Sequence, residues 1–247
     1  FYIGVEANPA PNFRANVEFN VMGNVAQNPI DEIFYENRGR PVVLNSDNGN
    51  VKVESLNRVQ VYRASYQWDH KWFSLNGFYR TGHYHWGYEG DFFGLYPEAN
   101  YGPQIDIYNG IAPFGFEVEG KKQLQGLKLA FGPQLWWGAN PALLMKYSKV
   151  IGKSTITGIY HEDLDQLGLT ESSFAIPQPK TRRVTLHLNR KFGKFGVDLG
   201  GIWAGQPLQG REFQLVRGEE GNYTVYKDQI NANDNFGGKI KLSYAGG

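Results

Sequence analysis

The chain lacks several features that define common protein classes. It contains no cysteine among its 247 residues, which excludes disulfide bridges and thiolate metal sites. It contains no run of about 20 apolar residues, so a membrane-spanning helix is excluded. Its formal net charge is only +1, so no strong overall field indicates nucleic acid or an acidic substrate. We therefore expect no nucleic-acid partner.

Catalytic and cofactor motifs are also absent from the sequence. There is no G-x-S-x-G or S-x-x-K nucleophile motif, and no glycine-rich phosphate loop before a helix. The turn NSDNGN (45–50) has Leu56 where a calcium loop needs its bidentate glutamate. His83 and His85 would share one face of a strand, but no third ligand stands at a fixed spacing. We assign no catalytic residue, metal or cofactor.

Aromatic residues and glycine are abundant instead. The chain has 15 Tyr, 16 Phe, 6 Trp and 31 Gly, yet its mean hydropathy is negative. A bacterial transmembrane β-barrel has this composition, because alternation along each strand hides its apolar side chains between polar ones. A soluble β-sandwich has a similar composition, so both classes stay open at this point.

The stretch NFRANVEFNV (12–21) shows the alternation clearly. Its odd positions from Phe13 to Val21 are apolar, and its even positions carry polar side chains. Because successive side chains of a strand point to opposite sides, this strand has one apolar and one polar face. In a membrane barrel the polar face lines a lumen. We therefore predict as lumen-lining residues Arg14, Asn16, Glu18, Asn20 and, on a later strand, Asp198.

Turn signals divide the chain into about 10–12 strands. Short connections are expected at 69–71, 121–126, 151–153 and 190–194, and long ones at 81–104, 163–181 and 205–222. Outer-membrane barrels have short turns on one rim and long loops on the other. Several strand arms have roughly nine to eleven residues, about the length that a tilted strand needs to cross hydrocarbon.

These observations predict an all-β fold, an antiparallel up-and-down β-barrel of outer-membrane type in the bacterial outer membrane. We expect one domain over residues 1–247, which begins in mid-pattern at Phe1 and so reads as a processed protein or a piece of a longer one. The alternative is a soluble β-sandwich or jelly roll. Expected partners are outer-membrane lipid or lipopolysaccharide, and another chain or missing segment that completes the barrel if 247 residues do not close it.

Two stretches carry a family resemblance: NPIDEIFYENRGRP (28–41) and the segment from YRASYQWDHKW (62–72) to GANPALL (138–144). Over residues 15–162 the chain resembles the C-terminal β-barrel region of large bacterial envelope proteins loosely labelled glycosidases. In these proteins a carbohydrate-binding-like module precedes an outer-membrane barrel. The resemblance implies an outer-membrane location and a connection with polysaccharide, without implying hydrolysis by this segment.

The densest candidate site is HYHWGYEGDFFGLYPE (83–98). Flat aromatic side chains there could stack on sugar rings and nearby carboxylates could bind hydroxyls, although a membrane-interface girdle uses the same residue types. The candidate ligand-binding residues are Tyr84, Trp86, Tyr88, Glu89, Asp91, Trp136 and Trp137. We predict a porin-like channel or anchor for polysaccharide or oligosaccharide capture or passage. The alternative is a soluble carbohydrate-binding module or a glycoside hydrolase, which needs two carboxyl groups that the sequence cannot pair.

Overall fold

The computed structural model describes eleven stretches of the chain, and every structural statement below concerns these alone. They are residues 2–21, 41–46, 49–54, 59–81, 83–85, 90–97, 99–101, 114–132, 141–164, 181–219 and 222–245.

The described residues are all-β and include one large antiparallel sheet, which confirms the all-β, antiparallel part of the predicted fold class, while the barrel stays a prediction. Their one helical element is the short 3-10 turn η1, Lys122–Leu124. Among them no helix is long and apolar enough to cross a membrane.

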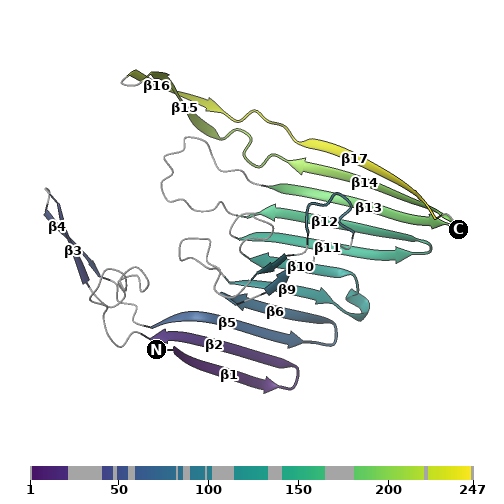
Figure 1. Ribbon diagram of the computed structural model, residues 1–247, viewed down its shortest axis with the longest axis horizontal. Coiled ribbons are helices and arrows are strands. Elements are labelled where there is room, and N and C mark those ends of the chain that lie inside the picture. Colours follow the sequence, from purple (N-terminus) through teal and green to yellow (C-terminus); the bar gives the residue numbers. More distant parts are fainter. Residues whose placement is uncertain are drawn as a thin grey trace. The chain divides into compact units, whose positions relative to one another are not determined.

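Eleven strands make up the main sheet (Figure 1). In hydrogen-bonded order they are β1 (Tyr2–Ala10), β2 (Phe13–Val21), β5 (Val59–Asp69), β6 (Phe73–Tyr79), β9 (Gly115–Gly120), β10 (Leu127–Gly132), β11 (Ala142–Ile151), β12 (Ser154–Asp163), β13 (Arg182–Phe192), β14 (Phe195–Gly205) and β17 (Asn235–Tyr244). Three two-stranded sheets lie in the connections: β3 (Pro41–Ser46) with β4 (Gly49–Glu54), β7 (His83–His85) with β8 (Ala99–Tyr101), and β15 (Glu212–Glu219) with β16 (Asn222–Gln229). The eleven strands of the main sheet lie within the predicted range of 10–12, but the described residues hold seventeen strands, because six more lie in the three smaller sheets that the sequence did not predict.

The chain divides into two compact units, residues 1–67 and 68–247. In the first unit β1 pairs with β2 so that Val5 faces Val17. The predicted polar face of β2 is formed by its even positions: the Glu18 carboxylate accepts a 2.7 Å hydrogen bond from Arg63 of β5. On the opposite face the Phe13 and Tyr66 rings stack with centroids 6.5 Å apart. The prediction of a single domain stays a prediction.

The second unit contains the long strands β11 to β14 and β17, of ten or eleven residues each. Two of its hairpins close through the same two-residue loop, Gly152–Lys153 and Gly193–Lys194. Both glycines have positive φ, 61° and 60°, as the tight turns that suit the twist of antiparallel strands require. These turns fix the register of the ladder from β11 to β14.

The connections alternate between short and long, as predicted. Two-residue turns join β1 to β2, β11 to β12 and β13 to β14, and slightly longer ones join β5 to β6 and β9 to β10. Every other connection in the main sheet is longer, and the expected 205–222 loop proves to contain strand β15. We call the strand ends next to the short connections the turn end, and the opposite ends the loop end.

The two faces of the sheet in the second unit differ sharply in exposure. On β10 to β13 every buried residue lies on one face, here the polar face, whereas the side chains of the other, the apolar face, are half-buried or exposed; β17 is exposed on both faces. The polar face includes the buried residues Glu117, Lys146, Thr157, His161, Asp163 and Thr185. The apolar face includes Met145, Tyr147, Ile156, Leu186, Leu199, Phe236, Ile240 and Leu242, each more than 40% exposed. The apolar face therefore exposes large side chains of a kind that water-soluble folds usually bury.

Candidate functional site

Residues 90–97, which connect β7 to β8, pack on the polar face of the second unit. We call them the 90–97 segment. Its backbone is turned by Gly90 and Gly94, at φ values of 77° and 72°. A side chain on Gly90 would lie 2.4 Å from the Thr157 methyl group of β12, so only glycine allows the backbone to approach the strand this closely.

Asp91 braces the 90–97 segment from within. Its carboxylate accepts hydrogen bonds from the backbone N–H of Leu95 at 3.1 Å and of Tyr96 at 2.6 Å. Its carbonyl oxygen accepts a third bond from the N–H of Gly94. Hydrogen bonds to a charged acceptor are among the stronger ones in proteins. The Asp91 side chain, expected from the sequence to bind a ligand, is therefore engaged in holding the loop's shape.

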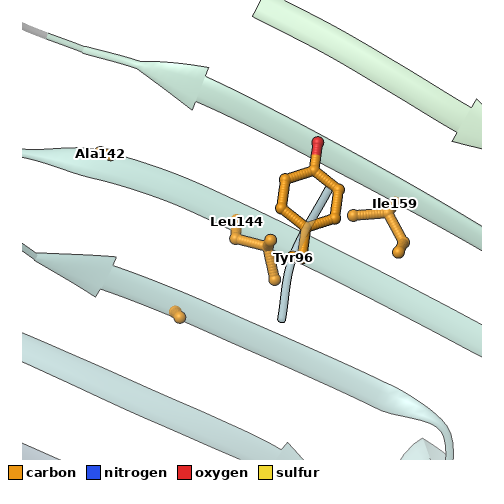
Figure 2. Packing of buried hydrophobic residues seen from close by; sticks show 5 residues of the cluster. Tyr96, Ala142, Leu144 and Ile159 are labelled. Atoms are coloured by element: carbon orange, nitrogen blue, oxygen red, sulfur yellow. The ribbon is translucent and has the colours of Figure 1, made fainter. Parts of the chain in front are cut away.

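Tyr96 anchors the segment in a small apolar area of the polar face. Its side chain is 2% exposed and packs with Ala130, Ala142, Leu144 and Ile159. Figure 2 shows the Tyr96 ring between Leu144 and Ile159. Burial of an aromatic side chain contributes about 1.5–3 kcal/mol, and it raises the pKa of the Tyr96 phenol well above its ordinary value. Tyr96 is therefore a neutral, apolar anchor.

Two basic side chains of the polar face border Tyr96. The Tyr96 ring meets the His161 imidazole edge to face, with centroids 5.4 Å apart. Arg183 lies on the next strand, β13. Its guanidinium is 5.8 Å from the Tyr96 ring centroid, within the range of a cation–π contact. The anchor is thus surrounded by the charged and polar groups of β12 and β13 rather than by a second apolar layer.

Phe92 makes a second attachment, to β13, β14 and β17. Its ring stacks on His187 with centroids 4.6 Å apart and planes 11° apart. The Lys239 ammonium donates a 2.8 Å hydrogen bond to the Phe92 carbonyl and lies 4.7 Å from the ring centroid. At Gly200 a Cβ atom would come within 2.4 Å of the Phe92 ring. The absence of a side chain at Gly200 therefore makes room for Phe92.

His187 is oriented by a hydrogen-bond network on the polar face. The Asp198 carboxylate lies 2.8 Å from His187 Nε2 and accepts a 2.7 Å bond from the Asn189 amide. Because β13 and β14 pair with Asn189 opposite Asp198, these groups are neighbours on one face. Asp198, predicted to line a lumen, lies on the polar face and positions the imidazole under Phe92.

A cavity of about 1440 Å³ lies on the turn side of the 90–97 segment. It extends from Gly90, Thr157 and His187 to the β9–β10 turn, residues 121–126. The lining includes four lysines but one acidic residue, Glu119. Neutral polar groups complete it, among them Gln123, Gln125, Ser148 and Asn189. The arrangement offers hydrogen-bond donors and positive charge to a bound solute.

The other candidate ligand-binding residues are only partly described. Tyr84 lies in the short strand β7, and nothing is described of its side chain. The remaining ones lie outside the described residues: Trp86, Tyr88, Glu89, Trp136 and Trp137. In the described part of the chain, no three His, Asp or Glu side chains gather as metal ligands. These assignments stay predictions.

The sequence reading missed the residues that fix the 90–97 segment: Phe92, Tyr96, His187, Gly200 and Lys239. One signal was present in the sequence GDFFG (90–94), where an aspartate follows the first of two glycines. This pattern is typical of a turn in which the carboxylate accepts hydrogen bonds from nearby backbone N–H groups. A second signal was the apolar Leu144 and Ile159 at polar-face positions of their strands. Neither signal says which strand the segment contacts.

Comparisons with known proteins add no assignment to this geometry. The chain matches no protein-family model, no curated protein and no solved structure. The functional interpretation therefore depends on the arrangement of the two faces, the 90–97 segment and the cavity.

Proposed function

We propose that this chain forms an outer-membrane β-barrel whose polar face lines a solute pathway and whose 90–97 segment narrows it. The observation that carries this proposal is that large apolar side chains are exposed on one face of the sheet while polar side chains are buried on the other. Leu186 is 59% exposed in the middle of β13, while Thr185 beside it on the polar face is 3% exposed. In water, an apolar area of this extent would cause aggregation or would need a covering partner. Lipid hydrocarbon would cover such a face without a protein partner.

The positions of charges on the apolar face support the same proposal. On the long strands they occur near the strand ends: Lys149 and Arg190 near the turn end, Glu162 and Arg182 near the loop end. Glu162 and Arg182 form an ion pair with each other. The strand centres between them carry none, as expected of a hydrophobic band whose charges lie at its borders.

Aromatic side chains also gather near the turn end of the apolar face. Phe195 and Tyr244 lie with ring centroids 4.9 Å apart, and Trp68 meets Phe73 edge to face at 5.3 Å. The Arg190 guanidinium lies 4.6 Å from the Phe192 ring centroid. Amphipathic rings beside cations are typical of the membrane–water interface. This supports the interpretation that aromatic residues near the strand ends form a girdle at the membrane–water interface.

Closure of the sheet is part of the proposal. The main sheet has eleven strands, an odd number. Bacterial single-chain outer-membrane barrels have an even number of antiparallel strands. We therefore expect a further strand, from another polypeptide segment, to complete the barrel between β1 and β17.

Engineered cysteines test this mode of closure cleanly, since the chain has none of its own. Val5→Cys would be combined in turn with Gly238→Cys, Ile240→Cys and Leu242→Cys, and each pair oxidised in the membrane. We expect no intramolecular disulfide. A disulfide in any of the three pairs would show direct β1–β17 pairing and contradict the added strand, because the Cα atoms of a bridge must lie within about 7 Å.

The function itself is tested by membrane fractionation, heat-shifted gel mobility and conductance in planar bilayers. We expect the chain in the outer-membrane fraction, with different mobility in boiled and unboiled samples, and with ion-conducting channels. A soluble chain would overturn the membrane location. A membrane-bound chain without a heat shift would overturn closure, and a closed barrel without conductance would make it an anchor. The connection with polysaccharide or oligosaccharide is supported by the family resemblance and by the hydroxyl-binding groups of the cavity.

A further inference from the structure

We propose that the cavity between the 90–97 segment and the β9–β10 turn is a binding site for an acidic oligosaccharide. The proposal names a substrate class for the pathway described above, and its physiological role rests on that proposed function. The binding site itself is argued from the cavity's size, its charges and the rigidity of the turn that presents them.

The charge of the lining is the first argument. Lys121, Lys122 and Lys128 face a single lining carboxylate, Glu119, whereas the fourth lysine of the lining, Lys149, belongs to the apolar face of β11. Glu119 lies 3.5 Å from the Lys128 ammonium and so offsets one positive charge. Lys121 pairs with Asp69, whose side chain is 71% exposed, and pairs this exposed to water are weak and readily exchanged. In the described part of the chain Lys122 forms no ion pair, so the lining keeps an excess of positive charge for an anion.

The β9–β10 turn, which presents Lys121 and Lys122, is held in one shape. A Cβ atom on Gly120 would lie 1.9 Å from the Leu124 carbonyl oxygen, and one on Gly126 would lie 1.9 Å from that of Ser148. The N–H of Lys121 donates a 2.7 Å hydrogen bond to the Trp72 carbonyl. Lys122 is held at a φ of 52°, a left-handed conformation that costs about 1–3 kcal/mol for a non-glycine residue and is concentrated at functional sites. A pre-organised backbone lowers the entropy cost of ordering the turn when a ligand binds.

The size and neutral groups of the cavity argue for a sugar rather than a small ion. A volume of about 1440 Å³ exceeds the roughly 300–1,000 Å³ of sites for drug-sized ligands. Amide groups of Gln123, Gln125 and Asn189 line it together with the lysines. They can donate and accept hydrogen bonds with hydroxyl groups, while ammonium groups bind carboxylates. A short chain of uronic acids combines these two kinds of group.

The test measures binding by titration calorimetry with the full chain in detergent, with trigalacturonate as the acidic probe and maltotriose as a neutral probe of equal length. We expect trigalacturonate to bind at least about tenfold more tightly, a difference of about 1.4 kcal/mol, with affinity falling as salt is added. In the variant Lys121→Gln/Lys122→Gln the affinity for trigalacturonate should fall at least about fivefold, since two charge-assisted contacts are lost.

The matched control is Lys153→Gln/Lys194→Gln, which removes two lysines from other turns outside the cavity lining. It should bind as the unchanged chain does, and circular dichroism melting should show that both variants fold. Equal binding of the two probes, binding of neither, or equal effects of the two variants would overturn the proposed site. Selective binding without conductance would overturn the proposed pathway but support the binding site. Conductance without selective binding would support the pathway but overturn the binding site.

Discussion

Phe92 lies flat on the His187 imidazole, with the ring centroids 4.6 Å apart. This stack joins a connecting segment to the wall of the sheet. Because the Asp198 carboxylate holds the edge of the imidazole, 2.8 Å from Nε2, the ring cannot easily turn away with Phe92. Together with Tyr96 the stack fixes the 90–97 segment at two points, and it identifies this segment as the place where variants should change the width of the proposed pathway.

Gly200 is the position at which the stack is most easily tested. In Gly200→Val the new side chain would occupy the space of the Phe92 ring, 2.4 Å from the Cβ position. We expect Phe92 to leave His187, single-channel conductance to rise, and proteolysis within residues 90–97 to accelerate by up to about tenfold, since an aromatic contact contributes about 0.5–1.5 kcal/mol. The control is Gly201→Ala, where nothing lies within 4 Å of the Cβ position. Equal behaviour of the two variants would contradict the role of Phe92.

A variant of Asp91 distinguishes whether this side chain holds the shape of the 90–97 segment or binds a sugar. In Asp91→Ala the N–H groups of Leu95 and Tyr96 lose their acceptor, a loss of about 1–3 kcal/mol. We expect hydrogen exchange at these two amides to accelerate about tenfold or more. Asp228→Ala, which removes a similar bond to the N–H of Gln229 on an exposed strand, should leave them unchanged. Unaltered exchange in Asp91→Ala with lost sugar binding would instead support the ligand role expected from the sequence.

Leu186 tests which solvent faces the apolar side. At the centre of a lipid-facing strand, Leu186→Arg should lower the free energy of unfolding by about 2–4 kcal/mol. Phe195→Arg, beside the turn, should cost only about 0–1 kcal/mol because an arginine there reaches the interface. Equilibrium unfolding in urea from lipid vesicles measures both. Small and equal effects at the two positions are the expectation for a water-exposed surface and would exclude lipid contact.

Gly126 tests the rigidity of the lysine-bearing turn. Its φ is 92°, and a Cβ atom would lie 1.9 Å from the backbone oxygen of Ser148. We expect Gly126→Ala to destabilise the chain by more than about 1 kcal/mol, because both strain and overlap must be relieved. Gly193→Ala has a positive φ of 60° but nothing within 4 Å of its Cβ position, so it should cost less. Thermal unfolding followed by circular dichroism compares the two, and a larger loss at Gly193 would contradict the packing argument.

The sequence by itself determined the long strands of the main sheet and their order, although not the short hairpins in the connections. Alternation in stretches such as Val184 to Leu188 specified a two-faced strand, since side chains alternate with a period of two. Turn residues such as Gly152 and Gly193 specified where the strands reverse. The alternating short and long connections and the strand number of the main sheet followed from these local signals. Each depends only on residues close together in the chain.

Only the tertiary structure decided which face is buried and what lies against it. The sequence left open whether Leu186 or Thr185 is covered, because alternation is the same for a sandwich and a barrel. The contacts of Phe92 with His187 and Lys239, and of Tyr96 with Leu144 and Ile159, join residues up to 147 positions apart. Local propensity carries no information about such pairings. They arise because the main sheet brings β10, β11, β12, β13, β14 and β17 side by side. It leaves one small apolar area on an otherwise polar face.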